Sequence, residues 1–283
     1  FEIVALPSDI RFYVAVPNSL HDLLEKQIHG SYPDAEIKIV DEYNIFSETG
    51  KVAFASLKLK SSPYYPLKVY KDLPVDPLSS ITSVLAKMGE GEGAAVQILI
   101  APASSKWQRH GRRFISKTKK LEANPDTAKY ATDAKTLEAI ESKVAKPGFT
   151  TAIRIVVSSA SIEAANAHLS NIMGSFTQFA SDQNSFTKAP QFFKRNFMID
   201  FIYRYFPLWR ANSVLTSEEL ATIYHFPNKS VETPHIYRLT AKRAPAPAKV
   251  AESGLFLGRS IFRGIVRPVY IGVEDRRRHM YVI

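Results

Sequence analysis

The order of strand and helix patterns in the first hundred residues constrains the fold of this chain most strongly. Aromatic and β-branched residues indicate strands there, and apolar residues at helical spacing indicate helices. The expected strands are residues 10–16, 35–40, 52–59 and 95–100, and the expected helices are residues 19–30 and 77–88. This order, strand-helix-strand-strand-helix-strand, is that of the ferredoxin-like split βαβ arrangement. We therefore predict an α+β domain of this kind over residues 1–103.

A second α+β domain is predicted over residues 104–243, and its first element is a basic helix at residues 106–122. The other expected elements are a helix at 133–146, a strand at 150–158 and an amphipathic helix at 161–179. Thr216 is followed by Glu218 and Glu219, which is typical of the start of a further helix. The order of these elements favours a second layer that packs as a domain of its own.

Residues 244–283 are predicted to be a linker and the β-rich start of a further domain. The segment Ala244-Pro-Ala-Pro-Ala-Lys249 has the composition of an extended linker. The last four residues, Met280–Ile283, form an apolar run without polar alternation, typical of a strand buried on both faces of a parallel sheet. Such a strand needs neighbouring strands and covering helices. We therefore expect the chain to be part of a longer protein that continues beyond Ile283.

Most of the chain resembles a known family, diffusely over Ile10–Ile37 and Asp76–Trp107 and most sharply in two segments. These are Asn212–Pro227 and Leu255–Ile283, which are similar to the region just before the Walker A loop of conjugative coupling-protein ATPases. That family belongs to the FtsK/HerA motor superfamily, and the similarity is closest to forms from small-genome bacteria. In those proteins a hinge of the form D-R-R-R-H-M-Y-x-I leads directly into G-x-T-G-x-G-K-S. Asp275–Ile283 matches the hinge, whereas no residue of this chain matches the Walker loop.

The resemblance implies that this chain is the non-catalytic N-terminal region of such a protein, with residues 244–283 as the linker and first strands of a truncated P-loop ATPase domain. The chain would then bind no cofactor itself, while the full-length protein would bind ATP and Mg²⁺. The family's role implies a hexameric, DNA-translocating motor of a type IV secretion or conjugation apparatus. Its expected partners are DNA, secretion-apparatus proteins and further copies of the same chain.

The same resemblance implies a place at the cytoplasmic face of the inner membrane, with membrane association through a segment outside this chain. Within such a protein, residues 1–243 would serve substrate recognition, membrane-side docking or contacts between subunits. The longest near-apolar run of this sequence, Ala94–Ala103, is far shorter than the roughly 20 residues that span a bilayer.

A cluster of basic residues is the clearest electrostatic feature of the sequence. The net charge is +10 at pH 7, and residues 101–120 hold seven Lys or Arg and no acid. Such a segment attracts nucleic-acid phosphate or an anionic membrane surface, and Trp107 and Phe114 within it would stack on exposed bases. The alternative is a solubilising helix whose two aromatic rings are core anchors. The candidate nucleic-acid-binding residues are Lys106, Arg109, Arg112, Arg113, Lys117, Lys119 and Lys120.

This cluster supports a function hypothesis that is independent of the resemblance. The chain would be a self-contained nucleic-acid-binding module that uses Lys106–Lys120 as its contact surface. Binding of that kind must weaken steeply with salt. A third hypothesis is an oligomerisation scaffold, for which a stable multimer without affinity for DNA would be the signature.

The second candidate site is the run Arg276, Arg277 and Arg278 after Glu274 and Asp275. Arginine presents a planar fork of donors that suits phosphate and carboxylate, so these residues would lie close to a nucleotide or to a neighbouring subunit. The alternative is a solvated turn whose opposite charges partly neutralise each other.

Other motifs give no catalytic residue and no metal site. The chain has no Cys, which excludes disulfides and thiolate zinc sites, and its seven His show no H-E-x-x-H spacing. Gly89-Glu-Gly-Glu-Gly93 superficially resembles a phosphate loop, but its two glutamates would repel phosphate and a flexible turn is expected instead. Ser116-Lys-Thr-Lys119 matches S-x-x-K without the partner motifs of that chemistry.

Overall fold

The computed structural model describes residues 1–33, 35–123, 133–191, 193–207, 213–228, 231–236, 251–262 and 265–277. The chain divides into two compact units. The first unit contains Phe1–Ala15 and Tyr43–Tyr237, and the second contains Val16–Glu42 and Arg238–Ile283. Within the described ranges, none of the helices combines the length and the apolar character needed to cross a bilayer.

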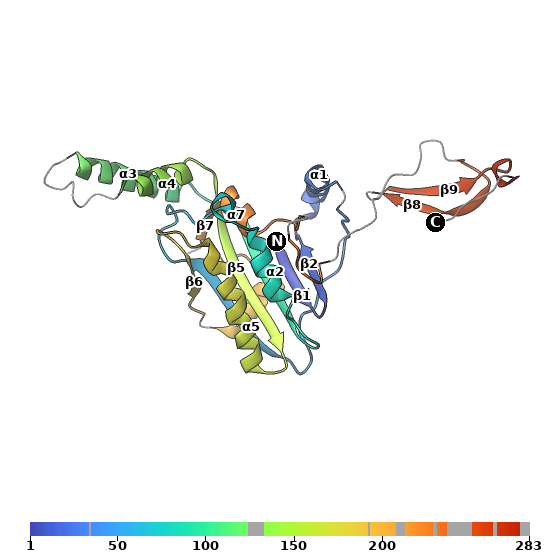
Figure 1. Ribbon diagram of the computed structural model, residues 1–283, viewed down its shortest axis with the longest axis horizontal. Coiled ribbons are helices and arrows are strands. Elements are labelled where there is room, and N and C mark those ends of the chain that lie inside the picture. The colour runs from blue at the N-terminus through green and yellow to red at the C-terminus, as the bar shows by residue number, and fades with distance from the viewer. Residues whose placement is uncertain are drawn as a thin grey trace. The chain divides into compact units, whose positions relative to one another are not determined.

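A mostly antiparallel sheet forms the centre of the first unit, so the fold class is α+β as predicted (Figure 1). Its strand order is β2-β1-β4-β5-β3-β6, and β7 pairs with β5 off this path. The strands are β1 (Glu2–Leu6), β2 (Asp9–Tyr13), β3 (Lys51–Leu59), β4 (Gly93–Pro102), β5 (Gly148–Ser159), β6 (Phe186–Ala189) and β7 (Ser213–Thr216). The longest pairing joins β4 and β5 and runs from Gly93 opposite Ser158 to Pro102 opposite Phe149.

Helices α2 (Pro77–Leu85) and α5 (Ile162–Ser175) cover one face of this sheet. The Asp76 side chain accepts a hydrogen bond from the Leu78 amide, and Pro77 occupies the first turn, as the sequence pattern predicts. Apolar side chains at alternate positions of the strands point toward these helices, because successive residues of a strand face opposite sides. Ala55 and Ile155 are examples that are fully buried in this core.

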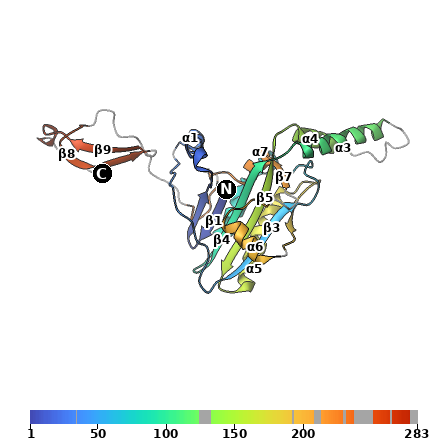
Figure 2. The ribbon, with the colours of Figure 1, turned by 180° about the vertical axis from the view of Figure 1, so that it is seen from behind.

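The opposite face of the sheet is covered by α6 (Lys194–Ile202) and by residues 43–46, as the reverse view shows (Figure 2). The ring of Phe197 on α6 stacks on that of Phe54 on β3, with centroids 4.4 Å apart. Because both faces are covered, β4 is buried from Gly93 to Ile98 and β5 from Thr151 to Ser159, which explains why apolar residues follow one another without alternation at 94–96 and 155–157.

A helical hairpin of α3 (Lys106–Glu122) and α4 (Ala134–Val144) is inserted between β4 and β5. It projects from one end of the sheet (Figure 1). Trp107, Ile115, Leu137, Ile140 and Val144 form a small core of its own, which also contains Val214 of β7. The predicted bounds of the basic helix, 106–122, agree with those of α3.

The expected boundary between residues 103 and 104 is not a boundary between compact units. Strands β3 and β4 precede it and β5, β6 and β7 follow it, yet all of them belong to one sheet. The ferredoxin-like domain predicted over residues 1–103 is therefore corrected. Local periodicity shows where strands are but does not show which strands pair across tens of residues.

The strand predicted at residues 35–40 is absent from the structure, in which residues 35–42 have no regular secondary structure. Ile39 is 84% exposed, so the alternation of apolar and charged residues there has no sheet neighbour to bury its apolar side. The strand β1, which the sequence analysis did not identify, instead pairs with β2 and β4.

The second unit contains α1 (His21–Ser31) and an antiparallel hairpin of β8 (Leu255–Phe262) and β9 (Ile265–Ile271). Apolar side chains of the hairpin are exposed, among them Leu255, Phe256, Leu257 and Val266. The β-rich character predicted for this region is observed. The predicted linker at 244–249, Arg278 and the terminal run 280–283 lie outside the described residues.

Candidate functional site: the basic surface of α3

All seven cations predicted as nucleic-acid ligands are exposed on α3. Their spacing places them on the solvent side of the helix, opposite the buried residues Trp107, Gly111, Ile115 and Thr118. Within the described part of the chain, Lys119 alone among the seven has an ion pair, with Glu141 on α4 at 2.6 Å. Its hydrogen bond to Glu141 and the charge of that carboxylate raise the pKa of Lys119. The other six cations keep their charge available to an external anion. We call these seven residues the basic surface of α3.

The aromatic residues of α3 do not belong to the basic surface. Trp107 is 6% exposed, and its ring packs so closely on Gly148 that a Cβ at that position would lie 2.7 Å from a ring carbon. Phe114 packs against the rings of Tyr64 and Tyr65, with centroids 5.3 and 5.8 Å away. The predicted stacking of these two rings on bases is therefore wrong. They are core anchors, as the alternative interpretation expected.

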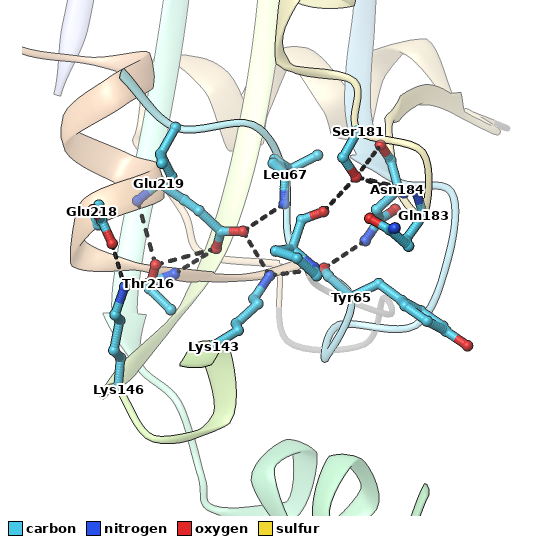
Figure 3. Close-up of polar contacts among 12 residues, drawn as sticks. Tyr65, Leu67, Lys143, Lys146, Ser181, Gln183, Asn184, Thr216, Glu218 and Glu219 are labelled. Carbon is cyan, nitrogen blue, oxygen red and sulfur yellow. Dashed lines mark hydrogen bonds and ion pairs between the residues drawn. The ribbon is translucent and has the colours of Figure 1, made fainter. Parts of the chain in front are cut away.

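A buried ion pair fixes the base of the hairpin to the sheet (Figure 3). The Lys143 ammonium lies 2.9 Å from Glu219 Oε1 on α7 (Ser217–Ile223), and the two side chains are 3% and 2% exposed. Lys143 also donates to the Tyr65 carbonyl at 3.1 Å, and the same Glu219 oxygen accepts the Leu67 amide at 2.8 Å. Burial lowers the pKa of Lys143, while the charge of Glu219 and its hydrogen bond act in the opposite direction.

Glu219 has a second structural role at the start of α7. Its other oxygen, Oε2, accepts the amide of Thr216 at 2.9 Å, and the Thr216 hydroxyl accepts the amide of Glu219, which forms a capping box. The sequence analysis identified this helix start. It did not identify Lys143 as the partner, because a contact between residues 76 positions apart leaves no local pattern.

Neighbouring polar contacts complete this attachment. Asn184 donates to the Tyr65 carbonyl at 3.1 Å, and the Ser181 hydroxyl donates to the Pro66 carbonyl at 2.7 Å (Figure 3). Glu218 pairs with Lys146 and, at 2.9 Å, with Lys71. Hydrogen bonds from Lys146 and Lys71 lower the pKa of Glu218. These contacts hold the α3–α4 hairpin, and with it the basic surface of α3, in a fixed orientation relative to α7 and the sheet.

A second buried polar network, which the sequence analysis also missed, lies under α6. Glu2 of β1 is 1% exposed and accepts hydrogen bonds from Gln97 at 2.7 Å and from Arg204 at 3.0 and 3.1 Å. Arg154 of β5 donates to Gln97 Oε1 at 2.9 Å and to the carbonyls of Asp200 and Tyr205. This network attaches the C-terminal end of α6 to the sheet. The polar interruptions at Gln97 and Arg154 within apolar strands were its only signal in the sequence.

The second candidate site is an exposed turn in the structure. Arg276 and Arg277 follow the β8–β9 hairpin, and Arg277 lies 3.7 Å from Glu274, with both side chains about four-fifths exposed. This geometry is that of the solvated turn that the sequence also allowed. Arg278 lies outside the described residues.

The glycine-rich segment 89–93 forms a turn from helix to strand. Gly91 has φ of +73°, and the Glu92 carboxylate accepts a hydrogen bond from the amide of Gly89 at 2.9 Å, so this amide already has an acidic partner within the turn. Among the described residues, no group of three His, Asp or Glu side chains could hold a metal ion.

The fold and the site define an α+β protein with a basic helical hairpin inserted into its central sheet. The chain belongs to the family described as "Domain of unknown function (DUF8128)", whose family model matches residues 1–238. The matched region contains all strands from β1 to β7 and the α3–α4 hairpin, whereas β8 and β9 lie beyond it. No curated protein matches this sequence.

Proposed function

We propose that this chain is the non-catalytic N-terminal region of a coupling-protein-like ATPase that moves DNA through a type IV secretion or conjugation apparatus. The observation that carries the proposal is the β8–β9 hairpin, whose exposed side chains include Leu255, Phe256, Leu257 and Val266. A two-stranded hairpin is marginally stable alone in water, so these residues favour a larger sheet that the hairpin begins. The resemblance of residues 255–283 to the segment before a Walker A loop supports a motor domain as the source of that sheet.

The fold of the first unit supports a finer proposal, which is a ferredoxin-like core over residues 51–189. Strands β3, β4, β5 and β6 follow one another with α2 after the first and α5 after the third. The two βαβ units are β3-α2-β4 and β5-α5-β6. In the spatial order β4-β5-β3-β6, β5 lies between the strands of the first unit and β3 lies between those of the second, as in the split βαβ arrangement. In this proposal α3 and α4 form an insertion between β4 and β5, which are the second and third of these four strands in the chain, and β1 and β2 extend the sheet.

Further properties follow from the proposal. The full-length protein would bind ATP and Mg²⁺ in its motor domain, assemble as a hexamer and act at the cytoplasmic face of the inner membrane. Membrane association would come from a segment outside this chain. The first unit would contact substrate, secretion-apparatus proteins or neighbouring subunits.

ATP hydrolysis tests the proposal. We expect a protein that extends beyond Ile283 through the motor domain to hydrolyse ATP and to do so faster with double-stranded DNA. We expect residues 1–283 alone to release no more phosphate than a heat-denatured sample. Hydrolysis by residues 1–283, or no hydrolysis by the longer protein, would contradict the proposal.

A second candidate function is nucleic-acid binding by the basic surface of α3, since six of its seven cations have no ion pair among the described residues. If the surface binds phosphates, removing one cation that touches a phosphate should reduce the salt slope of log affinity by about 0.9 for duplex DNA. A variant with four substitutions should therefore bind duplex DNA far more weakly at low salt. These substitutions are Lys106→Gln, Arg109→Gln, Arg113→Gln and Lys117→Gln.

The control variant removes the same charge from four exposed lysines elsewhere in the first unit. Its substitutions are Lys51→Gln, Lys60→Gln, Lys87→Gln and Lys188→Gln. Electrophoretic mobility shifts at several salt concentrations compare the two variants. Equal weakening of both would show that overall charge, and not the surface of α3, determines affinity.

A further inference from the structure

A groove runs between α3 and α4 and opens to solvent. It has a volume of about 610 Å³. Arg112, Ser116, Lys119, Lys120 and Ala123 lie along one side on α3, where their spacing places them on one face of the helix. The α4 side is formed by Glu141, Val144 and Ala145.

The floor and the rim of this groove differ in chemistry. Ile115 and Val144 at the floor are 8% and 4% exposed, and Ala123 and Ala145, which also line the groove, are small and exposed. Small apolar side chains let the backbone of another helix approach closely. At the rim, Arg112 and Lys120 have no ion pair among the described residues, whereas Lys119 is held by Glu141. The groove therefore combines an apolar floor with uncompensated positive charge on one edge.

We propose that the α3–α4 groove binds an acidic amphipathic helix of a protein partner. Apolar residues of that helix at i, i+3, i+4 and i+7 would pack on the floor, and its carboxylates would pair with Arg112 and Lys120. On the α3 side the lining residues run from Arg112 to Ala123. At a rise of about 1.5 Å per residue, this side offers roughly 16 Å of contact, enough for about three turns of a partner helix.

A protein partner fits this groove better than a nucleic acid does. The sugar-phosphate backbone has no apolar stripe to cover the floor, and the two aromatic rings that would stack on bases are packed in the core. The groove is formed by α3 and α4 alone. The inference therefore does not depend on the assignment to a coupling-protein-like ATPase.

A designed peptide tests the proposal directly. The probe is a fluorescein-labelled synthetic helix of about 18 residues with a Leu and Ala stripe on one side and Glu on the other. One counterpart peptide carries Lys in place of every Glu, and the other carries Ser in place of every Leu. We expect residues 1–283 to bind the acidic probe in fluorescence anisotropy and to bind each counterpart at least about 10-fold more weakly. Equal binding of the Ser counterpart, or no binding of the acidic probe, would overturn the proposal.

Paired charge reversals locate the binding site. Arg112→Glu with Lys120→Glu changes the groove edge, whereas Lys106→Glu with Lys117→Glu changes the same helix by the same charge away from the groove. We expect the groove variant to bind the acidic probe at least about 10-fold more weakly and the control variant to bind within about 2-fold of the unchanged chain. Far-UV circular dichroism confirms that both variants are folded. If both pairs of substitutions weaken binding of the acidic probe equally, the probe binds a diffuse electrostatic surface, as a nucleic acid would. That result would overturn the proposal that the groove is the binding site.

Discussion

The substitution Glu219→Ala is expected to lower the free energy of unfolding by about 3–5 kcal/mol, because it leaves the Lys143 ammonium buried without its charge partner. Both side chains are almost fully buried and lie 2.9 Å apart. The same change removes the acceptor of the Leu67 amide and the capping box at the start of α7. Urea unfolding followed by far-UV circular dichroism measures the loss.

Two controls separate the buried pair from ordinary surface charge. Glu218→Ala breaks partly exposed ion pairs next to it and should cost about 1 kcal/mol or less. Adding Lys143→Met to the Glu219→Ala variant removes the uncompensated charge and should restore part of the stability. A loss below about 1 kcal/mol for Glu219→Ala would show that the pair does not hold the hairpin in place.

The pH dependence of the Glu219→Ala variant gives a further signature. Burial lowers the pKa of Lys143 from its ordinary value of 10.5, and removing Glu219 takes away the charge and the hydrogen bond that oppose this effect. Between the lowered pKa and 10.5 the folded variant binds fewer protons than the unfolded chain, so its stability rises with pH in that window. The deficit relative to the unchanged protein should therefore shrink as the pH rises.

The substitution Arg154→Met is expected to lower the free energy of unfolding by a similar amount, about 3–5 kcal/mol. It leaves three acceptors without this donor beneath α6, which are Gln97 Oε1 and the carbonyls of Asp200 and Tyr205. Since these contacts join the end of α6 to the sheet, the amides of α6 should also exchange with solvent faster than those of α5. Hydrogen exchange read by mass spectrometry measures both regions in one experiment.

Arg11→Met is the matched control for this prediction. Arg11 pairs with Asp9 at 2.7 Å, but its side chain is 61% exposed, so the cost should be within about 1 kcal/mol. Equal losses for the two variants, or unchanged exchange in α6, would contradict the role of the buried network.

Local signals in the sequence were sufficient to predict several elements. The range of α3 and the start of α2 at Asp76 and Pro77 follow from helical spacing and from capping residues, which act within a few positions. Long-range pairing could not be predicted in this way. The sheet joins β4 to β5 across the inserted hairpin, and this pairing removes the expected boundary at residue 103.

In the candidate site, too, some features could be predicted from local signals in the sequence, and others depend on long-range contacts. Exposure of the seven cations follows from their charge, because an unpaired cation is costly to bury. The packing of Trp107 against Gly148 depends on a contact across the inserted hairpin, and neither residue alone indicates it. The buried pair of Lys143 and Glu219 is of the same kind, since each residue is ordinary in its own helix.

The sequence encoded directly after Ile283 tests the proposed function most directly. We expect a loop of the form G-x-x-x-x-G-K followed by Ser or Thr to begin directly after the hinge, so that its amides and its Lys hold the phosphates of ATP. A protein that ends there, or that continues without such a loop, would contradict the assignment of this chain to a coupling-protein-like motor.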